Sequence, residues 1–169
     1  MNNWFTLTSE EKFEVISQTA AQLGFSEVVI EKDWWVCMVL RAVFQSKYSE
    51  YIVFKGGTSL SKAYSIIERF SEDVDLIIDY HFLGFNDFQS KSQIKKLRKA
   101  SGNFVIGEFR EELIEQLIKL GISTEDFQIE FDPKIDDTSD PNTLELFYKS
   151  VVSNETKIQK KVILEMGAR

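Results

Sequence analysis

The stretch FKGGTSLSKAYSIIERFSEDVDLIID, residues 54–79, constrains this chain more than any other part of it. Residues 51–54 (YIVF) form a short apolar run typical of a buried strand, and residues 55–58 (KGGT) follow at once as a tight turn. Residues 59–68 then have helical spacing, and residues 73–79 (DVDLIID) alternate as a strand does. The sequence therefore predicts a strand, a glycine turn, a helix and a second strand in direct succession.

Two features of this stretch carry chemistry. Glycines in a strand-to-helix turn let backbone N–H groups approach a polyphosphate at the positive end of the helix. Fifteen residues separate Gly57 from Asp73, and Asp73 and Asp75 alternate on the second strand, so both carboxylates project from one face. Adjacent carboxylates repel each other unless a cation lies between them, and Mg²⁺ takes such oxygen ligands at about 2.1 Å.

Each feature alone has a plainer interpretation, because a Gly-Gly turn is usually just a turn and Asp-X-Asp is usually a solvated strand face. Their combination, with each part on the appropriate element, is much rarer. A phosphate-binding turn beside paired metal ligands favours metal-assisted phosphoryl or nucleotidyl transfer.

Helix and strand signals continue through the rest of the chain. Thr8 and Glu11 fit a capping box, which predicts a helix that begins there and stops at Gly24. A second, broadly apolar helix is expected over about residues 26–45. Two further helices, 90–100 and 104–120, and three strands, 127–131, 144–150 and 161–166, complete the expected elements.

The charge balance is acidic, because 27 Asp and Glu residues outnumber 20 Lys and Arg residues and give a formal net charge of −7. An acidic chain disfavours a large phosphate-binding surface, since duplex affinity depends mainly on Lys and Arg. One local exception is a run of five cations in nine residues: Lys91, Lys95, Lys96, Arg98 and Lys99. Two interpretations stay open for this run: a solvated helix face or a contact with RNA.

The second expected helix carries an unusual stripe. At 100° per residue, Trp34 and Met38 fall among Glu27, Glu31 and Arg41. The two apolar residues either tuck under neighbouring loops or form a docking face for a partner or a second domain. The single cysteine, Cys37, lies in the same apolar region and is expected to be buried as a packing residue.

The compartment follows from what the sequence lacks. The N-terminus has no basic region followed by an apolar core, so it does not match a secretory signal. The longest apolar run, residues 34–40, is far shorter than the roughly 20 residues needed to span a bilayer. A cytoplasmic protein is expected, with no contact to a membrane.

The motifs resemble those of a known group. Gly-Gly followed by Asp-X-Asp resembles the signature of the DNA polymerase β-like nucleotidyltransferase superfamily, although its spacing here lies at the long end of that pattern. Longer strings resemble the AbiEii/AbiGii toxin family: EKDWWV (31–36), GGTSLSK (56–62), RFSEDVDL (69–76) and ILEMGAR (163–169). The resemblance implies an α+β nucleotidyltransferase fold of the polymerase β-like type, a mixed sheet flanked by helices.

The resemblance also implies a function. Members act as toxins of type IV toxin–antitoxin and abortive-infection systems, and those characterised use an NTP with Mg²⁺. Some add nucleotides to the 3′ end of tRNA. A Mg²⁺-dependent nucleotidyltransferase (with Mn²⁺ as a further candidate ion), an RNA acceptor and a cognate antitoxin partner are therefore expected. The alternative is a module that binds an NTP or an antitoxin without turnover.

The resemblance also implies roles for individual residues, assigned here by matching positions in the family's motifs. Asp73 and Asp75 become metal ligands, and Glu165 becomes the third catalytic carboxylate. Glu130 and Asp132, which alternate on another expected strand, are the rivals of Glu165. The nucleotide-binding positions that the resemblance implies are Gly56, Gly57, Thr58, Ser59, Lys62, Arg69 and Ser71.

The domain organisation departs from that of the family. Residues 1–169 are expected to form a single nucleotidyltransferase core with N-terminal helices. Family members usually continue beyond the strand of Glu165 into a helical half with a further lysine-containing motif and an acidic motif. That half is expected to be absent from this chain, which would leave an open apolar flank near Trp34.

Overall fold

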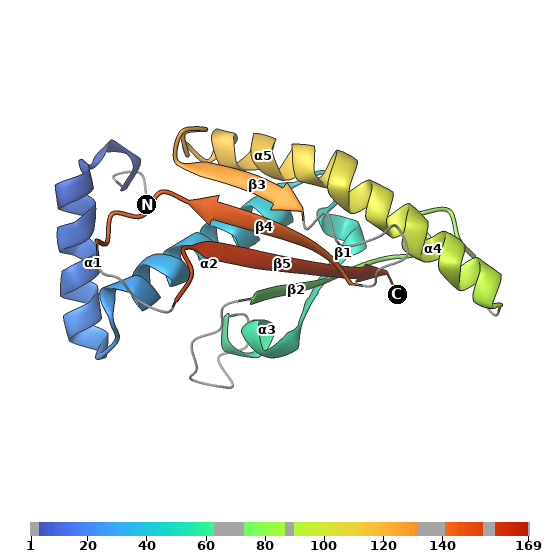
Figure 1. Ribbon diagram of the computed structural model, residues 1–169, viewed down its shortest axis with the longest axis horizontal. Coiled ribbons are helices and arrows are strands. Elements are labelled where there is room, and N and C mark those ends of the chain that lie inside the picture. Colours follow the sequence, from blue (N-terminus) through green and yellow to red (C-terminus); the bar gives the residue numbers. More distant parts are fainter. Residues whose placement is uncertain (1–3, 63–72, 87–89, 132–140, 154–157, 169) are drawn as a thin grey trace.

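A computed structural model describes residues 4–62, 73–86, 90–131, 141–153 and 158–168 of the chain (Figure 1). Within these residues five strands form one mixed sheet in the order β1-β2-β5-β4-β3. The strands are β1 (Ile52–Lys55), β2 (Asp73–Ile78), β3 (Phe127–Phe131), β4 (Asn142–Tyr148) and β5 (Lys161–Ala168). Strands β2 and β5 pair in parallel and the other neighbours are antiparallel. The expected α+β fold with a mixed sheet is confirmed.

One face of the sheet carries the core. Val74, Leu76 and Leu164 are almost completely buried, and α2 (Glu27–Gln45), α4 (Lys91–Phe104) and η3 (Val105–Phe109) pack against the strands. The alternate residues of β2 and of most of β5 are exposed or half-buried. A half-buried sheet of this kind places its polar side chains on a solvent-accessible face. Asp73, Asp75 and Glu165 all belong to that open face.

The N-terminal helices form as their caps predict. The helix α1 (Ser9–Leu23) begins with a complete capping box between Thr8 and Glu11. Its C-terminal Gly24 is left-handed with φ 72°, a conformation that costs little only for glycine. Ser26 is the N-cap of α2. The boundaries expected for both helices are confirmed to within one residue.

The two helices expected over residues 90–100 and 104–120 are one continuous rod. The helix α4 leads directly into the π-helical turn η3 and then into α5 (Arg110–Lys119). The break expected between them is therefore wrong. Ser101 and Gly102, which lie between the two expected helices, are buried inside the rod, and Gly102 lies against the Asn142 side chain. A small residue is needed there for close packing on β4.

The mixed stripe on α2 is only partly a solvent face: Arg41 is exposed, but two other members are buried. Met38 is 5% exposed and belongs to the core, and Glu31 is 3% exposed. The Glu31 carboxylate accepts hydrogen bonds from the Ser150 hydroxyl at 2.6 Å and the Val151 N–H at 2.7 Å. These bonds satisfy the buried charge and fasten α2 to the segment after β4.

Trp34 is half-buried beneath the N-terminal segment. The short helix η1 (Trp4–Thr6) places the Trp4 ring centroid 4.9 Å from that of Trp34, and the Phe5 centroid lies 6.2 Å away. Neighbouring parts of the same chain therefore cover Met38 almost completely and Trp34 in part. This agrees with the first interpretation of the stripe, in which both residues tuck under neighbouring segments. Cys37 is exposed, so its expected burial is wrong.

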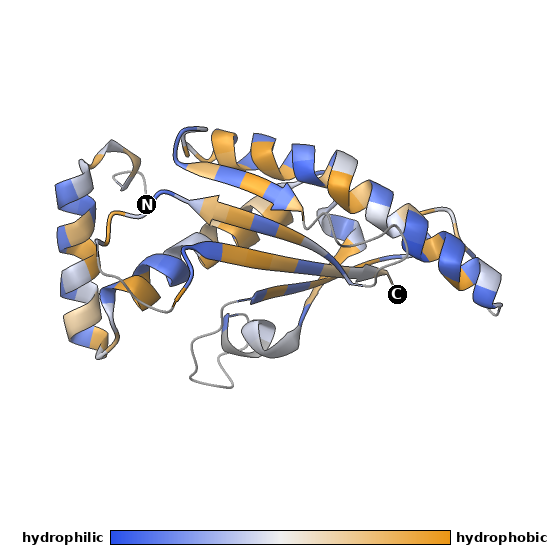
Figure 2. Cartoon of the chain, viewed as in Figure 1, coloured by the Kyte–Doolittle hydropathy of each residue, from blue (hydrophilic) through white to orange (hydrophobic). Residues whose placement is uncertain are grey.

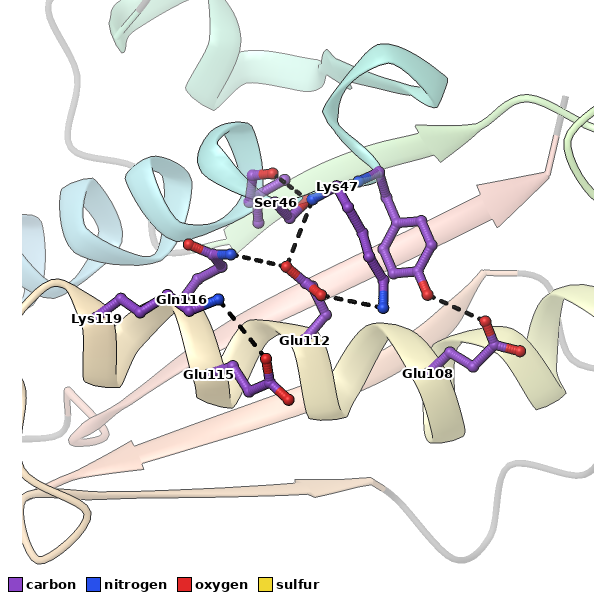
Figure 3. Close-up of polar contacts among 9 residues, drawn as sticks. Ser46, Lys47, Glu108, Glu112, Glu115, Gln116 and Lys119 are labelled. Carbon is purple, nitrogen blue, oxygen red and sulfur yellow. Dashed lines mark hydrogen bonds and ion pairs between the residues drawn. The ribbon is translucent and has the colours of Figure 1, made fainter.

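A polar network joins the end of α2 to α5 (Figure 3). The carboxylate of Glu112 is 6% exposed; it accepts a hydrogen bond from Gln116 Nε2 at 2.8 Å and lies 3.3 Å from Lys47 Nζ. Nearby, the Tyr48 hydroxyl donates to Glu108 at 3.0 Å. Burial tends to raise the pKa of Glu112, but the bonds from Gln116 and Lys47 outweigh it and leave that pKa below its ordinary value.

The replacement Glu112→Gln is expected to lower the free energy of unfolding by about 1–2 kcal/mol at pH 7. A carboxyl whose pKa is lower in the folded state stabilises the protein above its unfolded pKa, and the effect is lost as the pH falls through the folded value. The difference between wild type and variant should therefore shrink below about pH 4. Urea unfolding across pH 3–7 measures it, with Glu115→Gln as a control because Glu115 is 64% exposed in a surface pair with Lys119. A difference that stays constant with pH would contradict the prediction.

Candidate functional site

Sheet register brings the predicted carboxylates together. Asp75 and Glu165 are direct partners across the parallel pair β2–β5, and Asp73 is the partner of Ile163 one row away. Partner residues on adjacent strands project from the same face, with the strands about 4.8 Å apart. Asp73, Asp75 and Glu165 therefore share a small area of the open face. The strand placement expected of Glu165 is confirmed.

The glycine turn lies directly against this area. Gly56 begins α3 (Gly56–Lys62) with φ 76°, and a Cβ built on it would lie 2.0 Å from Asp75 Oδ2. Only a residue without a side chain permits such an approach. The backbone of the turn is thus pressed onto the Asp75 carboxylate.

The two hydroxyls of the turn bond within the protein. Thr58 Oγ1 donates to the backbone oxygen of Asp73 at 2.5 Å, and Ser59 Oγ donates to that of Gly56 at 2.8 Å. Both residues are at least 95% buried. The resemblance implies that both residues contact the nucleotide; in the structure the Thr58 bond ties the start of α3 to β2, and the Ser59 bond lies within α3.

Lys62 is predicted to contact the triphosphate, and it lies at the end of α3 as described. Its ammonium group forms an ion pair with the Asp33 carboxylate of α2. Both side chains are partly exposed, at 25% and 34%. The pair connects α3 to α2. Arg69 and Ser71, the remaining predicted nucleotide contacts, lie outside the described residues.

The structure adds one residue that the motifs missed. Lys55 is the direct partner of Asp75 across β1–β2, so its exposed side chain projects from the same face. On the other side of Glu165 the partner is Thr143 of β4. Lys55, Asp75, Glu165 and Thr143 thus form one row across four strands. The position of Lys55 immediately before Gly56 was the available signal in the sequence.

The rival carboxylate lies too far away. Glu130 is exposed on β3, and β4 and β5 separate that strand from β2. Three interstrand spacings amount to about 14 Å, beyond the reach of one ion shared with Asp73. Asp132 lies outside the described residues. The register therefore favours Glu165 over Glu130 as the third carboxylate.

The donor set of this face can be compared with the needs of Mg²⁺. Asp73, Asp75 and Glu165 offer only carboxylate oxygens, the ligands that Mg²⁺ prefers. As their side chains stand, no three Asp, Glu, His or Cys residues in the described part of the chain converge closely enough to hold an ion. The residues fit the ion in type and in strand position, and binding requires rotation of their side chains toward one another.

An open-faced mixed sheet with this turn and these carboxylates is a fold of the nucleotidyltransferase type. The sequence profile of a family described as nucleotidyl transferase AbiEii toxin, type IV toxin–antitoxin system, matches residues 39–169. The chain belongs to this family. The profile covers β1 through β5 and the glycine turn, whereas the EKDWWV string at residues 31–36 precedes it. Among curated proteins, no sequence matches the chain.

Membership of this toxin family implies an antitoxin partner. It does not identify the surface that the antitoxin covers. Within the described residues, no helix has both the length and the apolar character needed to cross a membrane.

Proposed function

We propose that this chain is a metal-dependent nucleotidyltransferase that moves a nucleotidyl group from an NTP to an acceptor hydroxyl. The observation that carries the proposal is the register of Asp75 with Glu165 on adjacent parallel strands, directly beside the close approach of Gly56. The three carboxylates and the glycine turn therefore adjoin on one open face. The family to which the chain belongs supports the same reaction type.

The proposed chemistry is an in-line displacement at the α-phosphorus. An oxygen of the acceptor forms a bond to phosphorus, the bond from phosphorus to the bridging oxygen of the β-phosphate breaks, and pyrophosphate leaves. Mg²⁺, or Mn²⁺ in its place, would neutralise the triphosphate and lower the pKa of the attacking hydroxyl. Asp73, Asp75 and Glu165 would hold the ion, and a carboxylate oxygen of Glu165 would accept the proton that the acceptor loses.

The turn and the adjoining cation would position the triphosphate. Backbone groups at Gly56 and Gly57 can approach phosphate oxygens because no Cβ intervenes at either residue. Lys55 adds a positive charge beside Asp75 on the same face. A cation there would stabilise the negative charge that develops on the leaving pyrophosphate.

The acceptor in this proposal is an RNA end, with tRNA as the first candidate, and the cognate antitoxin would act as inhibitory partner. A module that holds an NTP or an antitoxin without turnover is the alternative.

Transfer of radiolabel tests the proposal. The chain would be incubated with Mg²⁺, total RNA and an NTP labelled at either the α- or the γ-phosphate. Nucleotidyl transfer places the α-label on RNA and releases the γ-label as pyrophosphate. Label from the γ-position on an acceptor would indicate phosphotransfer instead. Mg²⁺-dependent thermal stabilisation by NTP without transfer would favour the binding module.

The replacement Lys55→Gln is expected to weaken NTP binding about tenfold, because a charge-assisted contact with phosphate is lost. The fold should be unaffected, since Lys55 is exposed on an edge strand. Titration of a fluorescent NTP analogue in the presence of Mg²⁺ measures the change. Lys149→Gln, which removes an exposed lysine beyond the end of β4, serves as the matched control. Equal NTP affinities of the two variants would show that Lys55 does not contact the nucleotide.

A further inference from the structure

The first half of α4 carries a basic face that the proposed chemistry does not use. Lys91, Lys95 and Arg98 are exposed and follow one another at spacings of four and three residues, which places them on one side of the helix. Together with Ile94 they line a shallow hollow of about 440 Å³. The rise of an α-helix separates Lys91 from Lys95 by about 6 Å along the axis and Lys95 from Arg98 by about 4.5 Å.

Charge is strongly segregated in this chain. Residues 90–99 contain five of the 20 cations and no carboxylate, so the rest of the chain carries −12 when the whole carries −7. The arrangement also disfavours the helix, because like charges four residues apart repel and a cation in the first turn opposes the helix dipole. The capping box between Ser90 and Gln93 offsets part of this cost. A solvated face does not need such a concentration of one charge.

The basic half of α4 projects past the end of the sheet (Figures 1 and 2), while its other half packs on the core face, opposite the face that carries the carboxylates. Asn142 Nδ2 lies 3.4 Å from Ser101 Oγ, and Asn142 is the register partner of Met166, the residue after Glu165. From Ser101 back to Lys91 the helix extends about 15 Å. The basic face therefore begins within one or two turns of helix from this end of the sheet, so a strand that reaches both the basic face and Glu165 must pass around the sheet edge.

We infer that the face formed by Lys91, Ile94, Lys95 and Arg98, here termed the α4 basic face, binds the phosphodiester backbone of a single-stranded nucleic acid. The inference rests on the proposed function, because it assigns the acceptor strand a path away from the carboxylates. Three cations in a line suit successive phosphates, and phosphate contacts position a strand without reading its sequence. Ile94 provides an apolar floor between the cations.

An RNA-binding measurement tests the inference. Fluorescence anisotropy reports the binding of a labelled single-stranded RNA of about 20 nucleotides, in the absence of NTP and divalent cation. Three phosphate contacts predict a slope of log affinity against log salt of about −2 for wild type. The double replacement Lys91→Glu/Lys95→Glu should weaken binding at least tenfold in 50 mM salt. It should also reduce the magnitude of the slope to less than about 1. Circular dichroism would show that the variant remains folded.

The matched control is Lys96→Glu/Lys119→Glu, which changes the net charge by the same −4. Lys96 lies away from the α4 basic face on the same helix, and Lys119 is 62% exposed on α5. This control should bind RNA within about twofold of wild type. Equal losses in both double variants, or no loss in either, would overturn the inference, because binding would then depend on overall charge or on another surface.

Two further measurements separate the inference from the proposed function. Asp73→Asn, which impairs the proposed metal site, should still bind RNA normally. A wild-type chain that binds NTP with Mg²⁺ but does not bind RNA would overturn the inference and leave the proposed function intact. Polyglutamate that competes as effectively as RNA would show an acidic protein as the partner and would also overturn it.

Discussion

Asp73→Asn is expected to abolish Mg²⁺-dependent NTP binding while the chain keeps its fold. The Asp73 side chain is exposed on the open face of the sheet, so the replacement removes a negative charge without creating a cavity. Asn keeps the shape of the side chain but is a poorer ligand for Mg²⁺ than a carboxylate. Calorimetric titration of NTP with and without Mg²⁺ measures the loss, and thermal unfolding checks the fold.

The radiolabel transfer assay separates the two candidates for the third carboxylate. Glu165→Gln should reduce nucleotidyl transfer more than about a hundredfold, since Glu165 lies beside Asp75. Glu130→Gln is the matched control, because Glu130 is exposed on the same sheet but lies on the edge strand β3. Wild-type NTP binding by Asp73→Asn, or an equal loss of activity in the two glutamine variants, would contradict this account of the site.

Gly56→Ala is expected to disrupt both the site and the stability of the chain. The new Cβ would lie 2.0 Å from Asp75 Oδ2, so either the turn or the carboxylate must move. The left-handed backbone at φ 76° adds roughly 1–2 kcal/mol of strain for a residue with a side chain. Loss of measurable NTP binding and a lower melting temperature are the expected results.

Gly84→Ala isolates the contribution of the backbone. Gly84 also has a left-handed backbone, at φ 84°, but nothing lies within 4 Å of the Cβ that it would acquire. This variant should lose a similar amount of stability through backbone strain and still bind NTP as wild type does. If Gly84→Ala and Gly56→Ala reduced NTP binding equally, the close contact of Gly56 with Asp75 would have no role in the site.

Local signals predicted much of the fold. The capping box at Thr8 and the glycine at position 24 defined α1, because the two ends of a helix depend on a few neighbouring residues. Strict alternation in β2 likewise separated the buried Val74 and Leu76 from the carboxylates. Such features require no knowledge of distant contacts.

Features that depend on tertiary contacts were predicted less well. The continuous rod of α4, η3 and α5 tolerates Gly102 because Asn142 packs against it, and that contact joins residues 40 positions apart. Met38 is buried and the Glu31 carboxylate accepts hydrogen bonds from the segment after β4, which helical spacing alone cannot indicate. Strand order was also needed to place Lys55 beside Asp75. The register of two strands that are distant in the sequence, such as β2 and β5, is a property of the folded sheet rather than of any local pattern.

The location of a bound metal ion tests the central claim most directly. Crystals of the chain grown with Mn²⁺ and a non-hydrolysable NTP analogue would show the ion by its anomalous scattering. The account predicts a peak bonded to carboxylate oxygens of Asp73, Asp75 and Glu165 at about 2.1–2.2 Å, with the triphosphate against Gly56 and Gly57. Nucleotide bound elsewhere on the chain, or an ion that none of these three carboxylates contacts, would contradict it.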